Sequence, residues 1–330
     1  MPSRIATRPG NRFSASGPTN ALKPCTGLTF SRGWLIRISK ETLQIAKDGK
    51  YYNRRGESVD ISKELQFSMQ NSVHYHSSHI FEPSKTTVPR FESTEFCVCF
   101  GTSLQVATKL QDELDQVYDH AEVGILNSAS GKFPDKFLRG TLSQEEGLCR
   151  ASLLYPCLEQ YKDRPHHFYY VNQKAKYQES CSSCAIYCPL VPVIREDSMR
   201  GDLLDNFRRF SFVSIPAPNA FVLGTDDVEA TTIPKAQKPG SNEKDKEFMT
   251  IDSAMHDRIF RALSIFAENG CTDLVLCAFG CGVHGNNPMK IAECFKSILL
   301  KELKGRFRLV VFAIQPSRPA NYEEFVSVFE

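Results

Sequence analysis

The chain has 330 residues, of which 41% are hydrophobic and 24% charged, a composition typical of a globular protein with a substantial core. Its formal net charge of +2 is too small to favour nucleic acid or a membrane surface as the main partner. No apolar run approaches the length of a spanning helix, and none near the N-terminus resembles a signal sequence. The twelve cysteines are therefore expected to be reduced thiols in a cytoplasmic or nuclear protein.

Residues 1–31 hold Arg, Ser, Pro and Gly but no acidic residue, which favours a disordered tail. A mitochondrial transit peptide is the alternative, although Pro and Gly interrupt any amphipathic helix there. Residues 32–95 are expected to form a helical N-terminal region, because residues 34–46 and 61–69 have helical spacing. The remaining residues, 96–330, are expected to form the main domain, with a polar, flexible insertion at residues 224–246.

Strand and helix patterns alternate through the main domain. We predict helices over residues 104–118, from Ser143 onward, and over residues 252–268 and 288–300. Strands are predicted near residues 96–100, 123–126, 167–171, 186–194, 210–215, 273–279 and 309–314. Several of these strands are continuous apolar runs, which indicates burial on both faces. The sequence therefore predicts an α/β fold in which helices cover both sides of a sheet.

Residues 143–150, SQEEGLCR, are predicted to open a helix whose first turn carries two adjacent carboxylates, Glu145 and Glu146. Ser143 and Glu146 have the spacing of a capping box, in which a hydroxyl and a carboxylate satisfy free backbone N–H groups. The alternative is a catalytic role. The helix dipole normally keeps a carboxylate at a helix start ionised, so an acid role requires burial or substrate to raise its pKa.

A second informative segment is residues 273–288, DLVLCAFGCGVHGNNP, in which a buried strand leads through a glycine-rich turn into a helix beginning at Pro288. Gly280, Gly282 and Gly285 would let backbone N–H groups approach an anion closely, so phosphate is the expected ligand. The same letters fit a nicotinamide-binding turn, but the strand that follows ends in Ile and Gln rather than in an acidic ribose ligand. A tight turn with glycines needed only for packing is the remaining alternative.

Two clusters have metal-like spacing. The first comprises Cys181, Cys184 and Cys188, to which His166 or His167 could add the fourth ligand of a tetrahedral zinc site. Cys181 and Cys184 have CxxC spacing, but the spacing of the third cysteine is irregular. The second comprises His74, His76 and His79, and a solvated turn explains it equally well. We therefore expect no metal and no cofactor.

In their order along the chain, five motifs resemble those of the microbial-type poly(ADP-ribose) glycohydrolases, which are macrodomain proteins with a helical N-terminal extension. The resemblance covers the chain from about residue 33. It is carried by RISKETLQIAKDGKYYNRRGESVDISKEL, ILNSAS with FLRGTLSQEEGLCRASLLYPCL, IYCPLVPVIRED, the triplet Ala217, Pro218 and Asn219, and LVLCAFGCGVHGNNP leading to VVFAI. It implies a three-layer α/β/α sandwich with a mixed sheet, and ADP-ribose in a cleft along the strand ends.

The resemblance also implies roles for individual residues. Glu146 corresponds to the catalytic acid at the end of the family's QEE signature, Glu145 to the neighbour that holds the ribose at the scissile bond, and Asn127 to a ribose contact. The other implied ligand-binding residues lie in the signature, the strand end and the diphosphate loop: Gln144, Ala217, Pro218, Asn219, Gly280, Cys281, Gly282, Val283, His284, Gly285 and Asn286.

The implied reaction is hydrolysis of an O-glycosidic ribose–ribose bond. An acid protonates the leaving hydroxyl, an oxocarbenium-like ribose forms, and water attacks. In the family the substrate's diphosphate orients that water, so one side-chain carboxylate suffices. The implied partner is ADP-ribose or poly(ADP-ribose) on modified macromolecules. We expect a monomer without membrane contact or direct nucleic-acid binding.

Two departures from the family pattern bear on catalysis. Where the family has a triple glycine shortly before QEE, this chain has Pro134 followed by Asp135, Lys136 and Phe137, which we include among the expected ligand contacts. Their side chains could block close backbone approach, and Asp135 would repel phosphate unless Lys136 offsets its charge. His284 replaces an aromatic residue that packs on the terminal ribose, and it could make activity pH-dependent. An ADP-ribose reader without turnover is therefore the alternative function.

Overall fold

The structure is a computed structural model that describes residues 31–82, 86, 88–117, 122–174, 182–223, 233–234 and 248–330. Most of the predicted tail and insertion, residues 1–30 and 224–246 except 233–234, lies outside the described residues, as does Cys181. In the part of the chain that is described, no helix combines the length and the apolar character needed to cross a bilayer.

The N-terminal region contains the two helices that the sequence predicts, α1 (Arg32–Asp48) and α2 (Ser62–Gln70). The side chain of Ser31 caps α1 by accepting from Trp34 N–H, and α1 ends at Gly49, whose φ is +68°. Two short strands, β1 (Lys50–Tyr52) and β2 (Ser58–Asp60), pair antiparallel between the helices. After α2 comes β3 (Val73–Tyr75), an unpredicted strand that joins the edge of the main sheet.

The described residues form a seven-stranded main sheet in the order β3-β6-β7-β5-β10-β11-β4. Its other strands are β4 (Glu95–Phe100), β5 (Val123–Ser128), β6 (Ala185–Arg195), β7 (Leu203–Ile215), β10 (Asp273–Cys277) and β11 (Leu309–Ile314). β7, β5, β10, β11 and β4 run parallel, whereas β6 is antiparallel to both of its neighbours. The predicted mixed sheet is confirmed.

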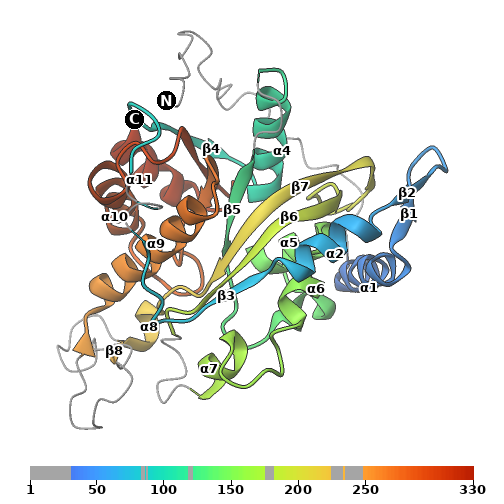
Figure 1. The fold of residues 1–330 in the computed structure, drawn as a ribbon, viewed down its shortest axis with the longest axis horizontal. Helices are drawn as coiled ribbons and strands as arrows, with labels where there is room; N and C mark the ends of the chain where they lie inside the picture. Colours follow the sequence, from blue (N-terminus) through green and yellow to red (C-terminus); the bar gives the residue numbers. More distant parts are fainter. Residues whose placement is uncertain are drawn as a thin grey trace.

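Helices cover both faces of this sheet (Figure 1). On one face lie α4 (Ser103–Leu114), α5 (Gln144–Ala151) and α6 (Leu154–Glu159), which pack in one hydrophobic cluster with α1 and α2. On the other face lie α9 (Ile251–Glu268), α10 (Pro288–Ser297), which continues into the π-helical turn η2 (Ile298–Glu302), and α11 (Pro319–Phe329). The three-layer α/β/α sandwich is therefore confirmed.

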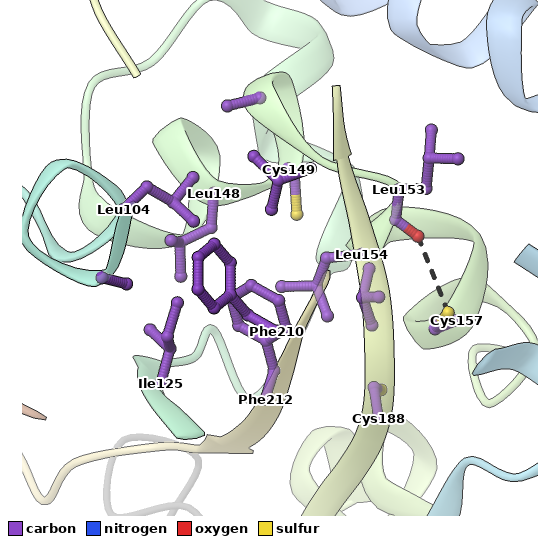
Figure 2. Packing of buried hydrophobic residues seen from close by; sticks show 14 of the residues in the cluster. Leu104, Ile125, Leu148, Cys149, Leu153, Leu154, Cys157, Cys188, Phe210 and Phe212 are labelled. Atoms are coloured by element: carbon purple, nitrogen blue, oxygen red, sulfur yellow. Dashed lines mark hydrogen bonds between the residues drawn. The ribbon is translucent and has the colours of Figure 1, made fainter. Parts of the chain in front are cut away.

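The start of α5 is held against the sheet by close packing (Figure 2). Leu148 and Cys149 of α5 belong to the same fully buried cluster as Ile125 of β5 and Phe212 of β7. In α6, the thiol of Cys157 donates to the carbonyl oxygen of Leu153 over 3.6 Å. Because such cores pack at crystal-like density, α5 has little freedom to shift relative to the strand ends.

One predicted element is wrong. Residues 167–171 were predicted as a strand, but the structure forms the helix α7 (Phe168–Lys174) there. A short apolar run such as FYYV does not by itself distinguish a strand from a buried helix. Both edges of the neighbouring strand β6 are already occupied by β3 and β7, so no place is left for a further strand beside it.

Three short elements complete the description. A 3₁₀ helix, η1 (Pro134–Arg139), precedes α5, and a four-residue helix, α8 (Ala220–Leu223), follows β7. Two residues each of β8 (Ile233–Pro234) and β9 (Phe248–Met249) pair antiparallel. Of these elements, η1 and α8 flank the strand ends at which the predicted site residues lie.

Candidate active site

The predicted site residues gather where three parallel strands end. β7, β5 and β10 are neighbours in the sheet and run in the same direction, so the segments that follow them meet at one edge. Hydrogen bonds link Asn127 at the end of β5 with Ser214 at the end of β7, and Cys277 at the end of β10 with Gln144 of α5. The site is therefore built from strand ends and the first turn of α5.

Gln144 fastens the start of α5 to its surroundings. Its Nε2 donates to Ser103 Oγ at 2.7 Å and to the Leu126 carbonyl at 2.9 Å, while its Oε1 accepts from Ser128 N–H at 2.9 Å. Both ends of this amide are thus engaged within the protein. We assign Gln144 to holding the helix start, rather than to the direct ligand contact expected from the sequence.

Glu145 is buried, with 2% of its surface exposed, and is held by two hydrogen bonds. Its Oε1 accepts from Asn127 Nδ2 at 3.3 Å, and its Oε2 accepts from Ser130 N–H at 2.9 Å. Burial raises the pKa of Glu145 from 4.5 to about 8, and the charge of Glu146 adds to this, although the Ser130 and Asn127 hydrogen bonds oppose it. This carboxyl group is therefore mostly protonated at neutral pH.

Glu146 is buried to a similar extent as Glu145, but its carboxyl group has fewer hydrogen-bond partners among the described residues. It is 4% exposed, and its Oε2 is buried without a hydrogen-bond partner among the described residues. The predicted capping box is wrong, because Ser143 occupies the N-cap position but makes no side-chain cap hydrogen bond. Gln144 fixes the helix start instead, through the hydrogen bonds of its side-chain amide. A buried unpaired oxygen of this kind is costly and calls for a functional explanation.

The glycine-rich loop after β10 has the conformation of an anion-binding loop. It turns at Gly280 (φ +72°) and Gly285 (φ +63°), and the Asn286 N–H donates to the Gly280 carbonyl at 3.2 Å. Within the described residues, the successive N–H groups of Gly282, Val283 and His284 donate to no acceptor. Consecutive free N–H groups form a concave site for an anion such as phosphate.

Two glycines of this loop are present for different reasons. A Cβ on Gly280 would lie 2.6 Å from Asn286 Nδ2 and 2.9 Å from Ala217 Cβ, so the packing of the protein itself requires glycine there. A Cβ on Gly282 would meet nothing within 4 Å. Packing alone therefore does not explain Gly282, whereas close approach of a ligand to the loop backbone does.

The segment after β7 is tied to this loop. Asn286 Nδ2 donates to the Pro218 and Gly280 carbonyls, both at 2.9 Å, and the Ala220 N–H donates to the His284 carbonyl at 2.8 Å. Asn286 is thus a structural link between the two segments. The remaining predicted residues also lie in these two segments. Ala217 and Pro218 are buried, and the half-buried Asn219 accepts a hydrogen bond from Phe221 N–H. The buried Cys281 thiol donates to the Phe279 carbonyl.

His284 belongs to the glycine-rich loop, and its surroundings shift its pKa. Burial lowers its pKa below 6.5, and the nearby positive charge of Lys136 lowers it further, while a hydrogen bond with the Ala217 backbone acts in the opposite direction. These effects favour the neutral form of the imidazole.

The η1 segment differs from expectation in two ways. Asp135 is paired with Lys162 at 3.7 Å, so Lys162, and not Lys136, offsets its charge. Phe137 was predicted as a ligand contact, but its side chain is fully buried and packs against Tyr155 with ring centroids 4.8 Å apart. Lys136 is exposed, and its positive charge lowers the pKa of both Glu145 and His284.

Part of the chain matches a known protein family. Residues 39–196 match the family model described as microbial-type PARG, catalytic domain, where PARG denotes poly(ADP-ribose) glycohydrolase. This part of the chain is therefore similar to the catalytic domain of microbial-type PARGs. None of the curated proteins matches it significantly.

Solved PARG structures have the same fold. The crystal structure of poly(ADP-ribose) glycohydrolase from Thermomonospora curvata is 28% identical over 89% of this chain and 99% of that one, with a TM-score of 0.74. Its complex with the inhibitor ADP-HPD covers 89% and 98% at the same identity, with a TM-score of 0.71. The Deinococcus radiodurans enzyme in complex with ADP-ribose is 28% identical over 81% of this chain and 97% of that one, with a TM-score of 0.64.

The two clusters with the spacing of metal ligands do not belong to the candidate site. Cys184 and Cys188 are buried, and no group of three or more His, Cys, Asp or Glu side chains among the described residues could hold a metal ion. His74 and His167 do come together, with ring centroids 4.9 Å apart. Burial lowers the pKa of His74 to about 4, with the charges of His167 and His76 adding to the effect.

Sequence reasoning missed three polar residues of the candidate site. Ser130 holds Glu145 through its N–H, Ser214 accepts from Asn127 at 2.9 Å, and Ser103 accepts from Gln144. Ser130 and Ser214 lie at or just after the ends of neighbouring parallel strands, and polar residues at that position are a signal that could have identified them. Ser103 begins α4, and no local pattern connects it with α5.

Proposed function

We propose that this protein hydrolyses the ribose–ribose O-glycosidic bonds of poly(ADP-ribose), with Glu146 as the general acid. The buried Glu146 oxygen without a partner carries the proposal, since it lies beside the hydrogen-bonded Glu145 at the strand edge that also presents the glycine loop. The match to the PARG catalytic domain supports the reaction class, and the similar solved structures named above are glycohydrolases with ADP-ribose or ADP-HPD bound.

The diphosphate of the terminal ADP-ribose unit binds to the loop after β10. The N–H groups of Gly282, Val283 and His284 donate to its oxygens, and the absence of a Cβ at Gly282 lets the phosphate approach the backbone. Lys136, whose charge acts on His284, adds a positive charge near the loop. This contact places the distal ribose of the same unit beside Glu145 and Glu146.

Glu146 donates its proton to the leaving oxygen, which becomes a hydroxyl of the penultimate unit as the bond to the anomeric carbon breaks. Water, oriented by the bound diphosphate, then attacks the oxocarbenium-like ribose. The water gives a proton back to the Glu146 carboxylate, so the enzyme returns to its starting state. One carboxyl group thereby acts first as an acid and then as a base.

Glu145 positions the ribose. Asn127 and Ser130 fix the orientation of its carboxyl group, and its pKa of about 8 keeps it mostly protonated at neutral pH. A neutral carboxyl group can donate and accept hydrogen bonds with ribose hydroxyls. It also avoids placing a second negative charge beside Glu146.

The test compares wild type, Glu146→Gln and Glu145→Gln for release of ADP-ribose from poly(ADP-ribosyl)ated protein, with calorimetry of ADP-ribose binding to each. We expect Glu146→Gln to abolish release while binding persists, and Glu145→Gln to slow release. Glu196→Gln is the matched control, because Glu196 forms only an exposed ion pair with Arg54 and lies outside the site.

A reader function is the second candidate, and the η1 segment is the observation that favours it. Side chains at Asp135 and Lys136 stand where the resemblance places glycines, and the positive charge of Lys136 acts on His284. Binding of ADP-ribose without release by the wild type would establish a reader. Absence of both binding and release would exclude both functions.

A further inference from the structure

Phe221 is a large apolar side chain left exposed beside the candidate site. It lies in α8, directly after the segment that follows β7, and 74% of its surface is exposed. Its ring rests on the glycine loop, since a Cβ on Gly285 would lie 2.5 Å from its Cε2 and Cζ atoms. Val283, in the same loop, is 79% exposed. Phe221 and Val283 thus place apolar surface at the rim of the diphosphate loop.

The backbone around Phe221 is fixed, although its ring is exposed. The Ala220 N–H donates to the His284 carbonyl at 2.8 Å, and the Phe221 N–H donates to Asn219 Oδ1 at 3.1 Å. The ring can lie directly against the loop because Gly285 has no side chain, and the loop conformation at Gly285 (φ +63°) favours glycine. The aromatic face is therefore held in place with one side free for a ligand.

The order of the strands indicates which part of the substrate lies next to Phe221. ADP-ribose is linear, with adenine, proximal ribose, diphosphate and distal ribose in sequence. If the diphosphate binds after β10 and the distal ribose at Glu145 after β5, the terminal adenine extends the other way, toward β11 and β4. The rest of the polymer then leaves on the β7 side, where Phe221 lies.

Resting on the proposed function, we propose that Phe221 stacks on the adenine of the penultimate ADP-ribose unit. The leaving oxygen belongs to the ribose that carries this adenine, so the base lies within one sugar of the bond that breaks. Aromatic side chains bind bases by such stacking without sequence preference. Phe221 therefore directs the enzyme toward polymer chains and away from single ADP-ribose groups, whose carrier has no adenine at this position.

The test measures binding in the Glu146→Gln background, so that no ligand is consumed. Three ligands are compared by calorimetry: ADP-ribose, ADP-ribose linked 1″→2′ to adenosine, and ADP-ribose linked in the same way to methyl riboside. Phe221→Ala should weaken the adenosine-linked ligand about tenfold, within the range for one base on an aromatic ring, and leave the other two unchanged. Phe221→Trp should retain the affinity. Phe67→Ala, an exposed aromatic on α2, is the control.

Three results would overturn the inference. Equal weakening of all three ligands by Phe221→Ala would mean that the ring only shapes the glycine loop, and no weakening of any would mean that it contacts no substrate. Failure of the Glu146→Gln protein to bind any of the ligands would exclude both this inference and the proposed function. Binding of ADP-ribose with no preference for the adenosine-linked ligand excludes the inference alone.

Discussion

Asn127 joins the Glu145 carboxyl group to two strands at once. Its Nδ2 donates to Glu145 Oε1 at 3.3 Å and to Ser214 Oγ at 2.9 Å, so one buried amide connects β5, β7 and α5. Its Oδ1 has no partner among the described residues, which leaves an acceptor for a ribose hydroxyl. Asn127 therefore orients Glu145 and offers a ligand contact from the same side chain.

Asn127→Ala should lower kcat on poly(ADP-ribose) by about 10- to 100-fold, because Glu145 loses one of its two fixed hydrogen bonds. The free energy of unfolding should fall by about 1–3 kcal/mol, as expected when a buried polar partner is removed. Steady-state kinetics and urea unfolding check these outcomes. Asn53→Ala is the matched control: Asn53 is also buried and hydrogen-bonded but lies after β1, so it should cost stability without a comparable loss of kcat.

The raised pKa of Glu145 makes stability depend on pH. Its pKa of about 8 in the folded protein exceeds the ordinary 4.5, so its stabilising contribution is fully present below pH 4.5 and is lost as pH rises through 8. Glu145→Gln removes this loss. The variant should gain stability relative to wild type between pH 5 and 9, by roughly 2–4 kcal/mol at the alkaline end.

Urea unfolding of wild type and Glu145→Gln at pH 5, 7 and 9 measures this difference. The exposed Glu196→Gln should show a difference from wild type that changes little over the same range. If the Glu145→Gln difference is also constant with pH, Glu145 is already ionised at neutral pH and its assigned role as a neutral ribose ligand is wrong.

The sequence was sufficient to locate Glu145, Glu146 and the glycine loop, because each lies where a strand gives way to a helix. In an α/β sheet, such positions along the chain map directly to the carboxyl edge of the strands. The alternation of buried strands and amphipathic helices likewise predicted β5, β10 and β11 and the helices α9 and α10.

What the sequence did not reveal depends on contacts between distant residues. Phe137 follows two charged residues and resembles a loop side chain, but contact with Tyr155 places it in the core. Asp135 pairs with Lys162 across the fold, and adjacency to Lys136 gave the wrong partner. The strand β3 is too short to have a recognisable period, and only its pairing with β6 defines it.

Two glycine substitutions in the diphosphate loop should have different effects. Gly282→Ala should fold normally, since its Cβ would meet nothing within 4 Å, but ADP-ribose affinity should fall about tenfold or more because the Cβ occupies the approach of the phosphate. Gly280→Ala should instead destabilise the fold by about 1–3 kcal/mol, because its φ is +72° and its Cβ would clash with Asn286 and Ala217.

Thermal unfolding and calorimetry separate the two substitutions. Unchanged stability together with full ADP-ribose affinity for Gly282→Ala would show that no ligand approaches the backbone at this residue. The assignment of the loop to the diphosphate would then be wrong.

Lys136 places a positive charge near the candidate site, and its removal should have two measurable effects. Lys136→Ala should weaken ADP-ribose binding about 3- to 10-fold at low ionic strength, with the difference shrinking as added salt screens this exposed cation. The pKa of His284 should rise in the same variant, because Lys136 is one of the causes that lower it. Calorimetry at two salt concentrations and NMR titration of the His284 ring measure the two effects.

Lys162→Ala is the control for Lys136→Ala, because Lys162 carries the same charge but is engaged with Asp135. Its removal leaves Asp135 without a described partner near the site, so it should weaken binding less and leave the pKa of His284 nearly unchanged. If Lys162→Ala weakens ADP-ribose binding as much as Lys136→Ala, the effect belongs to the general charge of the η1 segment. Lys136 would then make no specific contact with the ligand.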